Sequence, residues 1–127
     1  MHLALNLIQA GFPSPADDYA DTNFDISRFL IKKPAATFFV KAQGESMLDA
    51  GIFSGDLLVV DKSKNPQNGD VVIAFFDGEF TVKRFFQKAD KIILKPENKK
   101  FADIHVDKYE DFQIWGVVKY VIHNPNG

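Results

Sequence analysis

Two residues, Asp77 and Gly78, separate a run of apolar residues at 71–76 from a second strand-like run at 79–85. An Asp-Gly pair between two such runs is among the strongest short-range signals of a β-hairpin, because a type I′ turn needs a positive φ at both central residues. We therefore expect residues 71–85 to form a hairpin, with the two runs antiparallel to each other.

From residue 37 onward, the chain is a series of short strand-like runs separated by turn signals. Thirteen phenylalanines, many next to valine or isoleucine, favour strands over helices, because aromatic and β-branched side chains suit a pleated, half-buried surface. The predicted strands are 37–42, 56–61, 71–76, 79–85, 91–95 and 112–123, the last with a bend at Gly116. With 127 residues, we expect one mainly β domain of several short antiparallel strands with hairpins.

The first third of the chain has a different composition, with two prolines and several aspartates in "GFPSPADDYADTNFD". Each proline biases the preceding residue toward extended geometry, so Phe12 and Ser14 should be extended and the segment should form an arm. A short helical turn is expected around "DISRFLI", with Asp25 as its N-cap. The sequence thus predicts an N-terminal leader and arm over 1–34 and a β domain over 35–127.

The net charge of −2 gives no electrostatic footprint for DNA, so direct sequence-specific DNA binding is not expected. The chain has no cysteine, which argues against disulfides and thiolate metal sites and is compatible with a reducing cytosol. The first twelve residues lack the Lys or Arg of a signal peptide, and no run approaches the roughly 18 apolar residues of a membrane helix. We expect a cytoplasmic protein without a membrane anchor.

The three histidines, His2, His105 and His123, have no ligand partner at helical spacing or in a compact cluster, so we expect neither a metal nor a cofactor. A Ser-His-Asp triad of Ser46, His105 and an aspartate stays open, because the sequence cannot show whether these groups converge. The stretch "GESML" around the serine is not the G-x-S-x-G elbow of α/β-hydrolases, since a leucine stands in the place of the second glycine.

Taken alone, Ser46 reads as a turn residue that follows a glycine at the end of a predicted strand. A lysine could activate its hydroxyl only if desolvation lowered the lysine pKa from about 10.4 toward neutrality. Most lysines lie in turns or at strand ends, whereas Lys83 lies inside a predicted strand with Thr81 and Phe85 on its face. The residues alone favour an outward, solvated Lys83, because lysines on edge strands guard against aggregation.

The two blocks "GESMLDAGIFSGDLLVVD" and "NGDVVIAFFDGEFTVKRF" resemble the self-cleaving C-terminal domain of the LexA and phage repressor family, peptidase family S24. The resemblance is strongest to the UmuD branch. The motif match covers about residues 37–86, and similarity continues through "IQAGFPSPADDY" and "WGVVKYVI", so nearly the whole chain is involved.

This resemblance implies that Ser46 is the nucleophile and that Lys83, 37 residues later, is the general base. The backbone N–H groups of Glu45 and Ser46 would then stabilise the oxyanion that develops on the scissile carbonyl. Burial beside Phe85 would be the physical reason for a neutral Lys83.

In the UmuD branch the substrate is the protein's own N-terminal segment, cut before the glycine of a "GFPSP" stretch, which here is the Ala10–Gly11 bond. Small residues on both sides let the backbone approach the serine, and the alternation of Leu3, Leu5 and Leu7 suits an extended strand in a cleft. The leader before this bond is shorter than is typical of the branch, and alanine stands where some members carry cysteine. No helix-turn-helix precedes the domain, so we do not expect a repressor.

The resemblance therefore implies a Ser-Lys self-processing peptidase of the SOS response, stimulated by a RecA filament on single-stranded DNA. The trimmed homodimer would serve as accessory subunit of an error-prone Y-family DNA polymerase in translesion synthesis. Two alternatives stay open. One is a noncatalytic dimeric module that binds polymerase or RecA without cutting itself, and the other is a leader peptidase that acts on other proteins, against which the absent membrane anchor counts.

Overall fold

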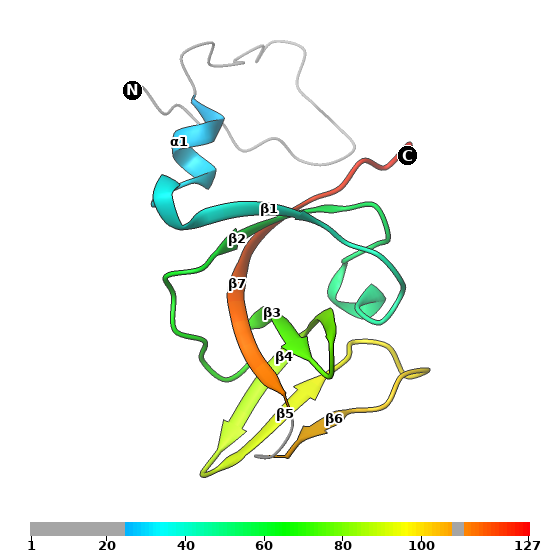
Figure 1. Cartoon of the computed structure of the whole chain (residues 1–127). Coiled ribbons are helices and arrows are strands. Elements are labelled where there is room, and N and C mark those ends of the chain that lie inside the picture. The colour runs from blue at the N-terminus through cyan, green and yellow to red at the C-terminus, as the bar shows by residue number, and fades with distance from the viewer. Residues whose placement is uncertain (1–24, 108–110) are drawn as a thin grey trace. The chain divides into compact units, whose positions relative to one another are not determined.

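The computed structural model of the chain describes residues 25–107 and 111–127 (Figure 1). The predicted extended arm and the Ala10–Gly11 bond lie outside these residues. The chain divides into two compact units, Met1–Lys32 and Lys33–Gly127, and each is described by itself. The predicted boundary at residue 35 is a division by function, between a leader and arm and a peptidase-like domain. This functional division stays a prediction.

The described part of the first unit contains one short helix, α1 (Ile26–Leu30). Asp25 is its N-cap, because the side chain accepts hydrogen bonds from the backbone N–H groups of Ser27 and Arg28 at 3.1 and 3.3 Å. The predicted helical turn and its cap are confirmed. Across all described residues, no helix has both the length and the apolar character needed to cross a membrane.

The described residues of the second unit form a seven-stranded sheet in which every pairing is antiparallel. Its strands are β1 (Thr37–Lys41), β2 (Leu57–Asp61), β3 (Val71–Phe76), β4 (Glu79–Lys88), β5 (Lys91–Lys95), β6 (Ile104–Val106) and β7 (Phe112–Ile122). Two short 3-10 helices, η1 (Pro34–Ala36) and η2 (Leu48–Ala50), flank β1 in the sequence. The mainly β, antiparallel class predicted from the sequence is confirmed.

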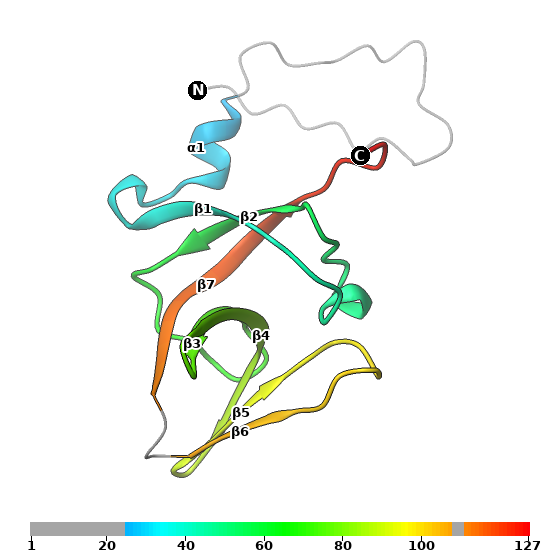
Figure 2. The ribbon, with the colours of Figure 1, turned by 45° about the vertical axis from the view of Figure 1, so that its right-hand side comes forward.

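The strand order is β1-β2-β7-β3-β4-β5-β6, so the last strand in the sequence lies inside the sheet, between β2 and β3. Figures 1 and 2 show β7 as a long strand that runs from the β1–β2 pair to the group formed by β3, β4, β5 and β6. The sheet therefore has two parts, and β7 pairs with a strand of each one.

The predicted hairpin is confirmed, because Asp77 and Gly78 have φ values of 50° and 84° and join β3 directly to β4. All six predicted strands form, although β4 continues three residues beyond the predicted end at residue 85, to Lys88. The short strand β6 was not predicted, since its three residues are too few to show an alternation.

The irregularity expected at Gly116 lies at its neighbour, Trp115. Ile73 pairs with Gly116 and the next residue of β3 pairs with Ile114, so Trp115 is an extra residue in β7. Gly116 itself is required by packing, because a Cβ atom at this position would lie 2.5 Å from Val60 Cγ1 of β2. The glycine thus allows β2 and β7 to approach each other closely.

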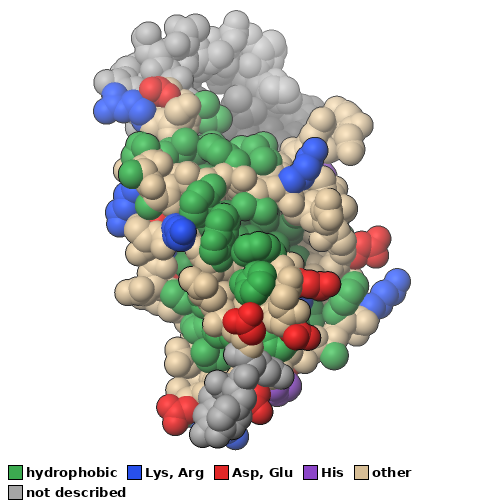
Figure 3. Space-filling model, in the orientation of Figure 1, with side chains coloured by type: hydrophobic (Ala, Val, Ile, Leu, Met, Phe, Trp, Pro, Cys, Tyr) green, Lys and Arg blue, Asp and Glu red, His purple; other side chains and the backbone are tan. Residues whose placement is uncertain are grey.

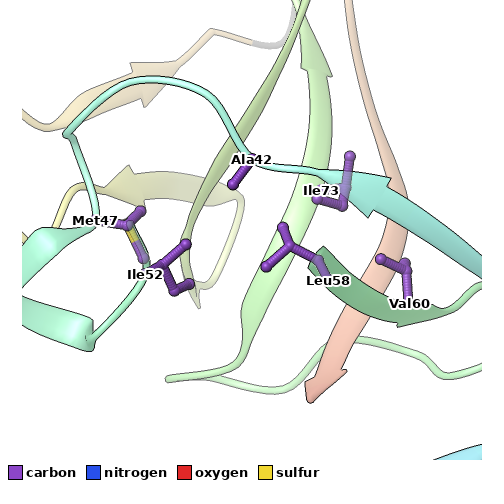
Figure 4. Close-up of a cluster of buried hydrophobic side chains, with 6 residues drawn as sticks. All are labelled: Ala42, Met47, Ile52, Leu58, Val60 and Ile73. Atoms are coloured by element: carbon purple, nitrogen blue, oxygen red, sulfur yellow. The ribbon is translucent and has the colours of Figure 1, made fainter. Parts of the chain in front are cut away.

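Two clusters of buried hydrophobic side chains hold the second unit together. The first, shown in Figure 4, contains Ala42, Met47, Ile52, Leu58, Val60 and Ile73. The second contains Val72, Ala74, Phe85, Leu94 and Val117. Met47 directly follows Ser46 and Phe85 lies two residues after Lys83, so a different cluster anchors the segment of each predicted catalytic residue.

Replacing Gly116 with alanine is expected to lower the free energy of unfolding by about 1–3 kcal/mol, because the new methyl group must displace the Val60 side chain. Urea denaturation measures this change. The double variant Gly116→Ala/Val60→Ala should be less destabilised than the sum of the two single variants, since the shorter side chain leaves room. Gln113→Ala, at an exposed position of β7, is the control with little effect. Strictly additive effects would contradict this explanation.

Candidate active site

Ser46 lies in the turn between β1 and η2. Gly44 has a φ of 86°, a left-handed conformation that favours glycine, and its N–H group donates a hydrogen bond to Ser54 Oγ at 3.3 Å. Met47, on the other side of the serine, is only 3% exposed and belongs to the first core cluster. The turn is therefore fixed on both sides of Ser46, as expected for a nucleophile that has to be held in place.

A second segment, residues 97 and 98, binds this turn from a distant part of the sequence. The backbone N–H of Glu97 donates to the Ser46 carbonyl at 2.8 Å, and its carbonyl accepts from the Asp49 N–H at 2.7 Å. Asn98 Nδ2 donates to the Glu45 carbonyl at 2.7 Å. The turn around Ser46 is thus bonded along its length to the loop that follows β5.

Lys83 lies on β4 opposite Val72 of β3 and is only 7% exposed. Its Nζ atom is 2.9 Å from Ser46 Oγ, 2.5 Å from Thr81 Oγ1 and 3.1 Å from the Val82 carbonyl oxygen. Burial lowers the pKa of the Lys83 ammonium below the ordinary lysine value. The structure thus brings together the two side chains that the resemblance singles out.

The expectation of an outward, solvated Lys83 is wrong. That expectation assumed an edge strand, but β4 lies between β3 and β5 and has a paired neighbour on each side. The turn that carries Ser46 lies over the face of β4 to which the Lys83 side chain points, and polar contacts there replace those with water.

The three contacts of Lys83 suit a neutral amine, which has two N–H groups and one lone pair. A carbonyl oxygen can only accept a hydrogen bond, so Val82 takes one N–H, and the Thr81 hydroxyl can take the other. The lone pair is then left to accept the hydroxyl proton of Ser46. The arrangement can therefore support general-base catalysis once the lysine has lost its proton.

A cleft of about 250 Å³ opens beside Ser46, between the end of β1 and the beginning of β4. Its walls include Val40, Ile73 and Phe80, and its polar groups include Thr81. The cleft is thus an open groove with both apolar and polar walls and the candidate nucleophile in its lining.

An aromatic cluster borders this cleft. The ring of Phe80, which is 60% exposed, lies edge-on to Phe75 and Trp115, with centroids 5.1 and 5.5 Å away. Trp115 in turn stacks on Phe38 of β1 at 4.4 Å. Figure 3 shows hydrophobic side chains gathered over β7 and its neighbouring strands. The exposed aromatic surface continues the apolar wall of the cleft.

Among the described residues, the backbone N–H groups of Glu45 and Ser46 have no hydrogen-bond acceptor. Both residues lie in a turn rather than in a helix or strand, so no regular secondary structure uses these donors. They are thus free to bind an oxygen atom that enters the site.

The alternative Ser-His-Asp triad is not formed. The polar side chain bonded to Ser46 Oγ is Lys83, whereas His105 lies on β6, opposite Ile93, with an exposed side chain. Within the described ranges, no group of three or more His, Asp or Glu side chains is placed to hold a metal ion.

A pair that the sequence did not indicate, a buried aspartate with an exposed histidine, joins the end of β7 to the loop before β2. Asp56 is 3% exposed; its Oδ1 is 2.6 Å from His123 Nδ1 and its Oδ2 accepts from the Phe53 N–H at 2.8 Å. Burial raises the pKa of this carboxyl group, but these hydrogen bonds outweigh burial and hold the pKa below its usual value. Because Ala42 N–H also donates to the Asp56 carbonyl, the pair supports the strand that leads to Ser46.

A family model and several known proteins each match most of this chain. The family model described as Peptidase S24-like matches residues 3–119. Protein ImpA of Salmonella typhimurium is 50% identical over 117 residues, which cover 91% of this chain and 78% of ImpA. Protein SamA of Salmonella typhimurium strain LT2 is 51% identical over 114 residues, covering 90% and 79% of the two chains.

Protein MucA of Escherichia coli is 40% identical over 123 residues, which cover 95% of this chain and 84% of MucA. ImpA, SamA and MucA are UmuD-like proteins. Since the family match extends over most of the chain and includes both Ser46 and Lys83, the chain belongs to the peptidase S24 family, as a UmuD-like protein.

Proposed function

We propose that this chain is a self-cleaving serine peptidase in which Ser46 is the nucleophile and Lys83 the general base. The observation that carries the proposal is the 2.9 Å contact between Ser46 Oγ and the buried Lys83 Nζ, in a chain of the peptidase S24 family. A serine activated by a desolvated lysine needs no third residue, because burial itself makes the amine available as a base.

The reaction begins when neutral Lys83 takes the hydroxyl proton of Ser46 and Oγ attacks the carbonyl carbon of Ala10. The N–H groups of Glu45 and Ser46 donate to the resulting oxyanion. When the Ala10–Gly11 bond breaks, the Lys83 ammonium returns its proton to the amino group of Gly11. Water, deprotonated by Lys83, then hydrolyses the ester on Ser46 and regenerates the enzyme.

The substrate on this proposal is the chain's own leader, residues 1–10. The strand β1 stands at one end of the sheet order, so its outer edge can pair with an added extended segment. The apolar side chains in the cleft lining, among them Val40, Ile73 and the exposed ring of Phe80, suit the alternating leucines of that leader. Alanine and glycine at the cut let the backbone approach Ser46 Oγ closely.

The UmuD-like relatives support a role in SOS mutagenesis. We infer that a RecA filament on single-stranded DNA stimulates self-cleavage during the SOS response. The processed chain then acts as a homodimer, as accessory subunit of a Y-family, UmuC-like polymerase in translesion synthesis. These partners are supported by family membership alone, whereas the dyad is supported by the geometry of the site as well.

Incubation of the full chain with RecA, single-stranded DNA and a nucleotide is expected to remove residues 1–10, as measured by intact-mass spectrometry. Ser46→Ala and Lys83→Ala should each lower the cleavage rate by at least about 10³-fold, because each removes one half of the dyad. The matched controls are Ser63→Ala and Lys91→Ala, which alter an exposed serine and an exposed lysine of the same domain. An intact mass in every case, with RecA active on another substrate, would instead favour the noncatalytic interaction module.

Self-cleavage without RecA is expected to accelerate about tenfold per pH unit and then to level off, because only neutral Lys83 can accept a proton. Burial lowers the Lys83 pKa, so the plateau should begin below the pH at which a solvated lysine deprotonates. Lys83→Arg, which stays protonated at all accessible pH values, should cleave at none of them. A rate that does not depend on pH, or cleavage by Lys83→Arg, would exclude Lys83 as the base.

A further inference from the structure

Residues 97 and 98 hold the turn around Ser46 through three hydrogen bonds, and none of them involves the side chain of Ser46 or of Lys83. Two of these bonds end on the carbonyl oxygens of the consecutive residues Glu45 and Ser46. The loop after β5 therefore fixes the directions of two peptide groups at the centre of the candidate site.

In a trans peptide, the C=O group of one residue and the N–H group of the next point in opposite directions. The described residues contain no cis peptide bond. Because Asn98 Nδ2 binds the Glu45 carbonyl at 2.7 Å, the Ser46 N–H must point away from Asn98. Ser46 lines the cleft, whereas neither Asn98 nor Glu97 does, which is the arrangement expected if this N–H faces the cleft.

The Asn98 side chain is itself held in one orientation. Its Oδ1 accepts a hydrogen bond from the Lys100 N–H at 3.0 Å, so its Nδ2 faces the turn and can serve only as a donor to Glu45. Among residues 25–107 and 111–127, the Glu45 carbonyl has one other donor, the Leu48 N–H, at the longer distance of 3.3 Å. Asn98 therefore makes the shorter of the two bonds that fix this peptide plane.

The neighbouring Glu97 connects the same loop to the strand of the general base. Its side chain accepts from Arg84 Nε at 2.5 Å, and Arg84 directly follows Lys83 on β4. Arg84 Nη1 also donates to the Gly69 carbonyl at 2.6 Å. The loop thus bonds both to the turn that carries Ser46 and to the strand that carries Lys83. It can therefore hold these two residues in position relative to each other.

We propose that Asn98 is a positioning residue for the oxyanion site. Its hydrogen bond to the Glu45 carbonyl holds the Glu45–Ser46 peptide in the orientation that directs the Ser46 N–H at the scissile carbonyl oxygen. Such a donor stabilises charge at little cost when it is already oriented before the reaction. This inference rests on the proposed self-cleavage and adds to it a residue that contacts neither substrate nor dyad.

The test measures the self-cleavage rate of full-length Asn98→Asp and Asn98→Ala on the high-pH plateau, where Lys83 is neutral in every variant. Asn98→Asp keeps the shape of the side chain and the acceptor for Lys100 but loses the donor to Glu45. Both plateau rates are expected to fall about 10- to 100-fold, somewhat less than the loss of an oxyanion donor itself. The pH midpoint of Asn98→Ala should match wild type, because the contacts of Lys83 are unchanged.

Asn124→Asp is the matched control. It introduces the same charge at an asparagine whose Oδ1 likewise accepts from a backbone N–H two residues later, Asn126, at 3.0 Å, and it should cleave like wild type. Melting temperatures identify damage to the fold, and if Asn98→Ala melts early, Asn98→Asp carries the test. A wild-type plateau in the folded Asn98 variants would overturn this inference alone. A wild-type chain that does not cleave would overturn the proposed function and the inference with it.

Discussion

The site depends on the burial of one lysine against one serine. A solvated lysine is protonated at neutral pH and cannot act as a base, whereas Lys83 is 7% exposed and its ammonium form is disfavoured. Burying a polar group also costs stability unless it is hydrogen-bonded. The hydroxyl groups of Ser46 and Thr81 and the Val82 carbonyl supply these bonds, so the same contacts that offset the cost of burial also place the amine beside the serine.

The contact requires accurate placement of two segments that belong to different parts of the core. Met47 fixes the turn of the serine in the first hydrophobic cluster, and Phe85 fixes the strand of the lysine in the second. The two clusters are joined through β3, where Ile73 belongs to the first and its neighbours Val72 and Ala74 to the second. Glu97 is bonded to both segments, since its N–H donates to the Ser46 carbonyl and its carboxylate accepts from Arg84 Nε, so the loop after β5 restricts relative movement of the two.

The parts of the structure that were predictable from the sequence are those specified locally. The Asp77–Gly78 turn, the cap at Asp25 and the six strands each depend on residues within a few positions of one another. Contacts such as those of Asn98 with Glu45 and of His123 with Asp56 join residues 53 and 67 positions apart, and no local pattern encodes them. The burial of Lys83 belongs to this second class, because it depends on the turn of Ser46, which lies 37 positions away in the sequence. The resemblance to a family indicated this burial, where the residues themselves favoured a solvated lysine.

Because burial activates the base, any change in the solvation of Lys83 should change the rate of the proposed self-cleavage. Desolvation lowers the pKa of Lys83, but its hydrogen-bond partners Ser46 and Thr81 line an open cleft, and water that enters this cleft favours the ammonium form. A segment or partner that fills the cleft excludes this water, lowers the lysine pKa further and raises the neutral fraction. Filling the cleft would then itself increase the fraction of Lys83 that can act as a base. Docking of the leader, or stabilisation of the docked leader by a RecA filament, would on this argument increase the reactivity of Ser46 without any rearrangement of the dyad.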